Sequence, residues 1–260
     1  AVEAIETLET GATVWVPSSA VYFYRRPMYF ETNSNGLAAG NTLAEATVHA
    51  LYELIERDAM TRINQDGRLR IGELARVIEL DSIDQPVLRA ILDRCQAHGT
   101  RVVLMALPSA VAVHTLWAVF LGETAVAPVS ALNVGWGTHP DPAIAATRAL
   151  TEAAQSRLGF IHGAREDLIR KPVHSATGVK QSRAYRFFTD LVPDTPWSAV
   201  CETPTLDLAG PAERVGARLV ESLRDAGNGP LVAFDLTKPD MDIPVVRVMA
   251  PSLAFNKRLF

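Results

Sequence analysis

The order of apolar and polar residues predicts a chain in which strands and helices are mixed. Alternating or uninterrupted apolar runs predict strands at residues 13–17, 18–29, 100–107, 111–121, 230–235 and 243–250. Apolar residues spaced by three and four predict helices after residue 40 and at 82–98, 142–158 and 211–226, with a short amphipathic segment at 185–191. We therefore expect the α/β (α+β) class, with mixed sheets packed against helices.

Polar segments connect these elements. We expect loops at 58–72, 161–183 and 193–211, a short helix or strand at 73–80, a turn at 122–124 and an irregular tail at 251–260. Glycines after the helical patterns, at 99, 159 and 227, predict where those helices end. The last predicted strand carries Arg247 inside an apolar run.

Two glycine-containing segments, 33–40 and 133–138, each precede a helix. A glycine-rich loop leaves backbone N–H groups available at a helix N-terminus, where the helix dipole favours an anion. Before the second helix, Asp141 can cap and Pro142 can take the first helical position. The order of apolar strand, glycine loop and capped helix occurs twice, which suggests an internally duplicated arrangement.

The helix after residue 40 predicts an acidic face. At about 100° per residue, Glu45, His49, Tyr52, Glu53 and Glu56 share one side, with Asn41 one turn earlier. The opposite side should be core and consists of Leu43, Ala46, Thr47, Ala50, Leu51 and Leu54. Because like charges at this spacing repel, the stripe needs either open water or a cation. Both interpretations remain open: a solvated face, or a magnesium–triphosphate site in which carboxylates hold the metal and Arg57 meets phosphate.

Composition narrows the functional classes. The chain has 260 residues and a net charge of −4, which argues against non-specific nucleic-acid binding. No apolar run reaches the roughly 18 residues of a membrane span, and the acidic first residues do not show the charged-then-apolar order expected of a signal peptide. Cys95 and Cys201 lack metal-ligand spacing, so we expect buried thiols in a reducing cytoplasm. The chain does not begin with Met, which fits a mature product or a partial sequence.

Three blocks of the sequence resemble the YcaO family. Residues 35–58 match its Ser/Asn-Gly-x-Ala-Ala-Gly-Asn loop and the helix that ends in Glu-x-Ile-Glu-Arg-Asp. Residues 133–158 look like its next block, a glycine loop and a helix ending in Glu-x-x-Gln-x-Arg. Residues 242–253 look like its late Pro-Val-Val-Arg-Val block. The resemblance implies one YcaO-like domain over residues 1–260, without the family's N-terminal portion.

The resemblance also implies a chemistry and a site. Family members use ATP and magnesium to phosphorylate a peptide backbone amide, after which an azoline ring closes or a sulfur donor gives a thioamide. The partners it implies are a peptide or protein substrate and an accessory protein of the TfuA type. We also expect a homo-oligomer, and the composition argues against nucleic-acid and membrane partners. The nucleotide-binding residues would be Asn41, Glu45, Glu53, Glu56, Arg57, Glu152 and Arg157, and the metal ligands Glu45, Glu53 and Glu56.

Two departures from the family pattern keep alternatives open. No Ser-x-x-Glu-x-x-Glu helix precedes residue 32, and residues 255–260 lack the proline-rich tail of many azoline-forming members. The missing tail favours thioamide formation or an accessory role in ribosomal-protein methylthiolation. The missing helix leaves room for a non-catalytic scaffold that binds a peptide or protein. A metal-dependent hydrolase that uses His49 with the carboxylates is the third hypothesis.

Overall fold

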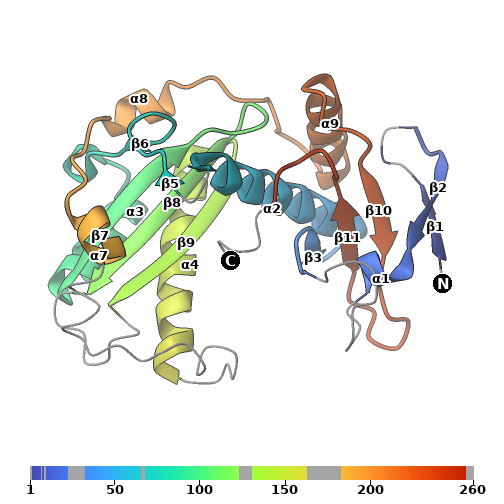
Figure 1. Ribbon diagram of the computed structural model, residues 1–260, viewed down its shortest axis with the longest axis horizontal. Helices are drawn as coiled ribbons and strands as arrows, with labels where there is room; N and C mark the ends of the chain where they lie inside the picture. The colour runs from blue at the N-terminus through green and yellow to red at the C-terminus, as the bar shows by residue number, and fades with distance from the viewer. Residues whose placement is uncertain are drawn as a thin grey trace. The chain divides into compact units, whose positions relative to one another are not determined.

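The computed structural model describes residues 2–6, 8, 10–22, 33–65, 68–122, 131–162 and 183–255 (Figure 1). These residues form helices and antiparallel sheets, so the predicted mixture of helix and sheet is confirmed. The chain divides into two compact units. Unit 1 contains Ala1–Arg62, Ser109–Ala112 and Leu206–Phe260, and unit 2 contains Ile63–Pro108 and Val113–Thr205. A single family domain over residues 1–260 stays a prediction.

Unit 1 is built on a three-stranded antiparallel sheet. Its strand order is β10 (Val232–Asp235), β11 (Val245–Met249) and β3 (Leu37–Ala39), so an early strand pairs with the last one. In this register Arg247 lies opposite Leu37. A hairpin of β1 (Val2–Glu6) and β2 (Thr13–Pro17) leads into the short helix α1 (Ser18–Val21). Val21 packs with Val232 and Phe234 of β10, so this segment covers part of the sheet.

Two helices complete unit 1. Helix α9 (Ala212–Asp225) buries the predicted stripe of Val215, Leu219, Val220 and Leu223. Helix α2 (Leu43–Ile63) is buried along its second half, where between residues 50 and 60 only positions 53 and 57 are partly exposed. The solvated interpretation of the acidic face therefore does not hold at Tyr52 and Glu56, which are 4% and 8% exposed. Leu43, expected in the core, is 42% exposed because it lies at the open end of the helix.

Unit 2 is built on a four-stranded antiparallel sheet. The order is β6 (Arg76–Val77), β7 (Thr100–Leu107), β8 (His114–Gly122) and β9 (Leu132–His139). Helices α3 (Pro86–Ala97) and α4 (Pro142–His162) pack on one face, where Leu88 and Ala149 join the side chains of β7 and β8. On the other face the ring of Trp117 stacks on that of Trp136, with centroids 6.3 Å apart. Phe188 of α7 (Arg183–Thr189) meets the Trp117 ring edge-on, with centroids 5.2 Å apart. β8 is buried along its whole length because both faces are covered.

The glycines at 133–138 form a strand, so the loop predicted there is wrong. Gly135 and Gly137 lie within β9 and face α4. A Cβ at Gly135 would overlap the backbone of Ala149 and Ala153, and one at Gly137 would overlap Ala145 O. Glycine is required here because the helix backbone lies directly against the strand. The segment 33–40 is likewise not all loop, because it contains β3.

Several predicted boundaries also change. Residues 18–21 are helical rather than extended, and α2 continues to Ile63 because Asp58, Ala59 and Met60 are buried. α4 runs past Gly159 to His162. The predicted loop at 193–211 contains α8 (Trp197–Cys201), and the residues around 58–82 contain β4 (Asn64–Gln65), β5 (Arg68–Leu69) and η1 (Leu80–Ser82). The predictions for residues 23–29, 123–124, 163–182 and 256–260 lie outside the described residues.

Two sequence expectations concern compartment. Among the described residues, no helix combines the length and apolar character that crossing a bilayer demands. Both cysteines are free thiols, but Cys201 is exposed rather than buried as expected, and Cys95 is half-buried. Burial is the largest cause of a raised pKa at both thiols. A cytoplasmic location stays a prediction.

His114 at the start of β8 predicts a pH dependence of stability. It is 7% exposed, and burial lowers its pKa below the ordinary value, with Asp141 opposing this shift and His139 adding to it. Because the unfolded chain then binds the proton more readily, stability falls as the pH drops below about 6.5. We expect urea unfolding at pH 7 and pH 5 to show a smaller loss in His114→Gln than in the wild type. The same loss in His114→Gln and in the exposed-site control His98→Gln would contradict this assignment.

Candidate functional site

The N-terminus of α2 is closed by its own side chains. Thr42 Oγ1 accepts a hydrogen bond from Glu45 N at 3.1 Å. Glu45 Oε2 in turn accepts from Asn41 N at 3.0 Å and from Asn41 Nδ2 at 2.9 Å. This reciprocal pattern is close to a capping box, in which a hydroxyl and an acid three residues later satisfy exposed N–H groups. Asn41 and Glu45, two predicted ligands, are therefore brought together as a helix cap.

Glu45 has the electrostatics of a cap. The hydrogen bonds from Asn41 lower its pKa most, and the nearby His49, 3.8 Å away, adds to the effect. The carboxylate turns toward Asn41 and hence away from Glu53, which lies about 12 Å further along a helix that rises about 1.5 Å per residue. Glu45 would have to leave the cap to share a cation with Glu53.

Replacing Glu45 should therefore test a structural role. We expect Glu45→Gln to lower the melting temperature slightly at neutral pH, because a neutral amide accepts the Asn41 bonds less strongly. The lowered pKa means that this contribution is present above the unfolded value and is lost as the pH falls through the folded one. Circular dichroism melts at a series of pH values from 7 downward should thus show a difference between variant and wild type that is full at pH 7 and shrinks as the pH falls. A difference that stays the same as the wild type is acidified would contradict the cap explanation.

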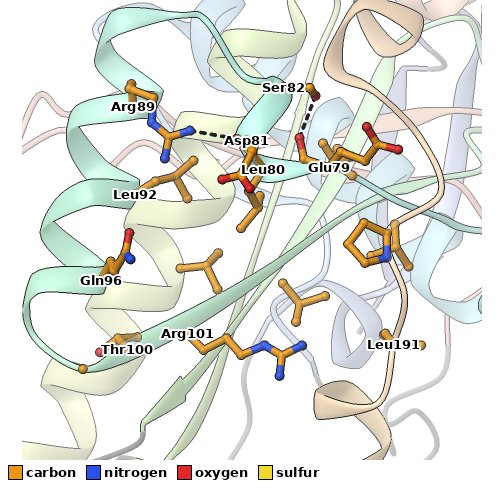
Figure 2. A pocket seen from close by; sticks show the side chains of 16 residues that line it. Glu79, Leu80, Asp81, Ser82, Arg89, Leu92, Gln96, Thr100, Arg101 and Leu191 are labelled. Carbon is orange, nitrogen blue, oxygen red and sulfur yellow. Dashed lines mark hydrogen bonds between the residues drawn. The ribbon is translucent and has the colours of Figure 1, made fainter.

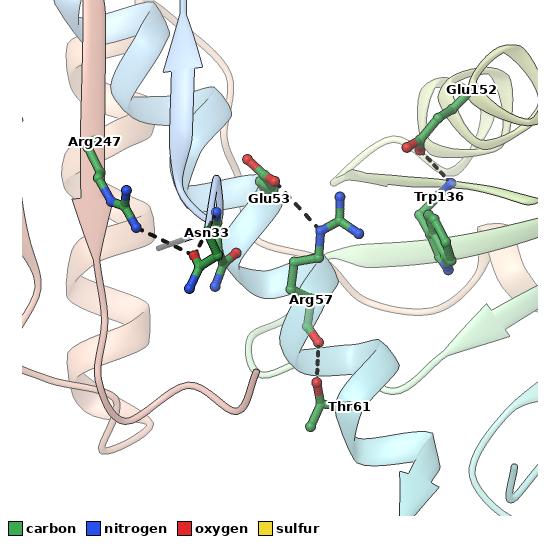
Figure 3. Close-up of polar contacts among 8 residues, drawn as sticks. Asn33, Glu53, Arg57, Thr61, Trp136, Glu152 and Arg247 are labelled. Atoms are coloured by element: carbon green, nitrogen blue, oxygen red, sulfur yellow. Dashed lines mark hydrogen bonds and ion pairs between the residues drawn. The ribbon is translucent and has the colours of Figure 1, made fainter. Parts of the chain in front are cut away.

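The second half of the predicted stripe lies lower on α2. Arg57 Nε is 3.6 Å from Glu53 Oε1, and the side chains are 18% and 23% exposed (Figure 3). Glu56, almost buried, lies three residues from Glu53. Side chains at this spacing are neighbours on a helix, so Glu53 and Glu56 can approach the same cation. The limited exposure of these groups excludes a fully solvated acidic face at this level of the helix.

Arg247 on β11 is a buried cation that the predicted site did not include. It is 3% exposed, and its Nη1 donates to Val21 O at 3.0 Å and its Nη2 to Asn33 Oδ1 at 3.4 Å (Figure 3). No described group accepts from its Nε. Burial lowers the pKa of Arg247, while the negative charge of Glu53 acts in the opposite direction. The sequence signal that could have identified Arg247 as a buried cation is its position within an apolar strand.

Asp58 has a structural role next to this site. It is fully buried, pairs with Arg62 and accepts a hydrogen bond from Ala254 N at 2.8 Å. The last acid of the helix motif therefore fixes the segment that follows β11. A charged residue on the core side of a helix is the sequence signal for such an anchor.

The two predicted residues of α4 have different surroundings. Glu152 accepts a hydrogen bond from Trp136 N at 2.7 Å, on the outer edge of β9 (Figure 3). Arg157 Nη1 donates to Thr100 Oγ1 at 2.6 Å and so ties α4 to the start of β7. Their hydrogen bonds therefore run to different strands of unit 2. A nucleotide role for each stays a prediction.

The described residues suit a metal-bound polyphosphate in part. They contain no group of three or more His, Cys, Asp or Glu side chains arranged to hold a metal, so the set Glu45, Glu53 and Glu56 does not meet as one centre. Mg²⁺ commonly takes only one or two carboxylates and completes its shell with water and phosphate. Glu53 and Glu56 supply that number, and Arg57 and the unpaired Nε of Arg247 supply donors for an anion. The hydrolase hypothesis with His49 gains no support from this arrangement.

The fold and these side chains define a mixed α/β protein whose longest helix in unit 1 carries carboxylates and an arginine suited to magnesium and phosphate. A family model described as YcaO cyclodehydratase, ATP- and Mg²⁺-binding, matches residues 3–254. The chain belongs to the YcaO family. The resemblance inferred from the sequence motifs is therefore confirmed, and the predicted cofactors agree with the description of the family.

Two relatives extend over nearly the whole chain. An uncharacterized protein of Methanothermobacter thermautotrophicus is 33% identical over 255 residues, which cover 95% of this chain and 64% of that protein. An uncharacterized protein from the tfuA 3′ region of Rhizobium leguminosarum bv. trifolii is 31% identical over 253 residues, covering 94% of this chain and 58% of that protein. The chain thus spans less than two thirds of the length of these relatives.

Solved structures share the fold. YcaO from Methanopyrus kandleri, bound with AMPPCP and Mg²⁺, has a TM-score of 0.78 and 26% identity, covering 97% of this chain and 64% of that one. A heterocyclase in complex with substrate and cofactor has a TM-score of 0.75 at 23% identity, covering 98% of this chain and 33% of that one. The latter likeness concerns the fold alone.

Proposed function

We propose that the chain is the ATP- and Mg²⁺-using part of an enzyme that activates a backbone amide of a peptide, leading to a thioamide or an azoline. The observation that carries this proposal is the cluster of Glu53, Glu56 and Arg57 on α2, at limited exposure, in a chain that belongs to the YcaO family. The Methanopyrus kandleri relative, which binds AMPPCP and Mg²⁺, supports the choice of ATP.

Each residue of unit 1 has a proposed task. Glu53 and Glu56 would hold magnesium, and Arg57, now paired with Glu53, would bind a phosphate oxygen. Arg247 places a buried positive charge near Glu53, and the charge of Glu53 in turn opposes the effect of burial on the pKa of Arg247. When bound, ATP supplies the phosphoryl group that turns the amide oxygen into a leaving group. Low exposure of these side chains limits water near the reacting groups.

The remaining predicted residues have more limited proposed tasks. Asn41 and Glu45 close the first turn of α2 and so fix the part of the helix that precedes the metal ligands. Glu152 accepts a hydrogen bond from Trp136 N, and we propose a nucleotide or metal contact for the same carboxylate. Arg157 stabilises α4 through Thr100, and we propose a phosphate contact only for its remaining nitrogens.

The proposed partner is a peptide or protein substrate, together with an accessory protein. The relative from the tfuA 3′ region motivates the addition of a TfuA-like protein to any activity assay. A homo-oligomer is also proposed, and the assays should therefore be accompanied by a measurement of mass in solution.

The reaction is tested by mass spectrometry of candidate peptides incubated with the protein, ATP, Mg²⁺ and a sulfide source, with and without a TfuA-like protein. Replacement of one oxygen by sulfur would identify thioamide formation, and loss of one water would identify azoline formation. Omitting Mg²⁺ should prevent both products. Failure of ATP to bind in the presence of Mg²⁺ would reject the proposal and leave the non-catalytic scaffold.

A further inference from the structure

The sheet of unit 2 has an incomplete edge at β7. β6 pairs only with the C-terminal part of this strand, where Arg76 lies opposite Ala106 and Val77 opposite Met105. One further bond runs from Ile78 N to Leu104 O at 2.9 Å, after which the chain departs toward α3. The first half of β7 therefore has β8 on one side and no described strand on the other.

The register shows which backbone groups face this open edge. Because Leu104 accepts from Ile78, its backbone groups point away from β8, and so do those of Val102 and Thr100, since alternate residues of a strand point to the same side. The other side of the sheet leads to the same assignment. Gly122 N donates to Ala131 O and so points away from β7, which means that Thr100, its partner in the register, points away from β8. No described group pairs with the N–H and C=O of Val102 at this edge, although Val102 is only 8% exposed.

A cavity of about 600 Å³ lies against this edge. Gly99 to Val103 all line it, and because neighbouring side chains of a strand point to opposite faces, the cavity must border the edge itself. Figure 2 shows Arg89, Leu92 and Gln96 of α3 on one side, the segment from Glu79 to Ser82 along another, and Leu191 opposite α3.

The chemistry of this cavity selects an extended peptide as its occupant. The edge offers an N–H and a C=O from the same residue, and a neighbouring strand supplies the complementary pair at the matching spacing. Apolar side chains such as Leu92 and Leu191 accommodate alternate residues of a strand. The lining also contains cations and acids, including Arg101 and Asp81, so it does not favour a ligand of one charge. By contrast, at the outer edge of β9 the N–H of Trp136 already donates to Glu152.

We propose that the β7 edge binds a segment of the peptide substrate as an added strand, alongside Thr100 to Val103. The inference rests on the proposed function for the identity of the peptide as substrate. The docked segment lies in unit 2 and makes main-chain hydrogen bonds to Val102, while the nucleotide groups on α2 belong to unit 1. The peptide is thus recognised through its extended backbone, with alternate side chains in the cavity.

The test selects a random linear peptide library, displayed on phage, on the wild-type protein and on Val102→Pro. Proline removes the N–H of Val102, which faces the edge, and leaves the β7–β8 bonds intact. Val102→Ala, which keeps that N–H, is the matched control. We expect selected peptides to bind the wild type and Val102→Ala similarly and Val102→Pro about tenfold more weakly, as the loss of a main-chain hydrogen bond implies.

A second measurement does not depend on how the proline variant folds. Selected peptides are synthesised with a single N-methyl group at each position in turn and titrated against the wild type. An added strand predicts loss of binding at alternate positions only, because every second N–H faces the protein. Equal binding to Val102→Pro, an N-methyl pattern without alternation, or no enriched peptide would overturn the proposal. So would a wild-type dimer that becomes a monomer in Val102→Pro, since the edge would then pair with a second copy.

The outcome can be separated from that of the proposed function. Peptide capture is measured without nucleotide, and Glu53→Gln, which removes a proposed metal ligand in unit 1, should retain it. If peptides bind as an added strand but ATP does not bind, the docking site stands and the proposed chemistry fails. If ATP binds with Mg²⁺ but no peptide does, the reverse holds.

Discussion

Glu53→Gln should abolish the thermal stabilisation that AMPPCP with Mg²⁺ gives to the wild-type protein. A ligand that binds only the folded state at about 100 times its dissociation constant stabilises that state by about 2.7 kcal/mol. The neutral amide is a poor magnesium ligand and no longer attracts the buried Arg247. The variant also loses its ion pair with Arg57, so its melting temperature without nucleotide should fall as well. The quantity to compare is therefore the increment, by which we mean the rise in melting temperature that AMPPCP with Mg²⁺ causes in each protein, measured by calorimetry.

Glu45→Gln provides the matched control, because it is the same substitution on the same helix at the cap. If Glu53 and Glu56 form the metal site, Glu56→Gln should behave like Glu53→Gln, while Glu45→Gln should keep most of the increment. If all three variants lost the nucleotide-induced stabilisation equally, Glu45, Glu53 and Glu56 would all be supported as metal ligands, as the sequence predicted. An increment unchanged in Glu53→Gln would remove magnesium from this part of α2.

The sequence predicted most elements because their signals are local. The apolar spacing of α9 and the uninterrupted apolar run of β7 each determine an element without reference to the rest of the chain. The cap of α4 was also predictable, since Asp141 Oδ1 accepts from Ala143 N at 2.8 Å. Boundaries such as the end of α2 were not, because the burial of Asp58 depends on Ala254, which is distant in sequence.

The candidate site was only partly predictable for the same reason. Glu53, Glu56 and Arg57 follow one another at helical spacing, so their proximity could be read from the sequence. The pairing of β11 with β3 brings Arg247 opposite Leu37, a relation that no local pattern encodes. Glu45 shares the spacing of the other acids, yet the same spacing allows a capping box. The hydrogen bonds with Asn41 and Thr42 become visible only in the folded structure.

The glycines of the second motif were misinterpreted because two physical uses of glycine give the same composition. A glycine in a loop provides backbone freedom, whereas a glycine in a strand permits close approach of another backbone. In both cases the sequence shows small residues before a helix, so composition alone does not distinguish the two uses. The alanines at 145, 149 and 153 on the following helix were the distinguishing signal, since a small-residue stripe on a helix matches a glycine strand lying against it.

Gly135→Ala should accordingly be among the most destabilising single substitutions in unit 2, by about 3 kcal/mol or more. The added Cβ meets backbone atoms of Ala149, Glu152 and Ala153, and backbone cannot move aside as a flexible side chain can. Relief requires α4 to shift away from β9, which would also lengthen the hydrogen bond from Trp136 N to Glu152.

Gly159→Ala is the matched control, because it makes the same substitution within α4 where nothing lies within 4 Å of the new Cβ. In a helix, alanine is more favourable than glycine by about 0.5–1 kcal/mol, so this variant should be slightly more stable than the wild type. In urea unfolding, the same Gly→Ala substitution should therefore lower the free energy of unfolding at position 135 and raise it at position 159. If Gly135→Ala unfolded at the same urea concentration as Gly159→Ala, the close contact of β9 with α4 could not be the reason for glycine in this strand, and a backbone role for the glycine motif would have to be reconsidered.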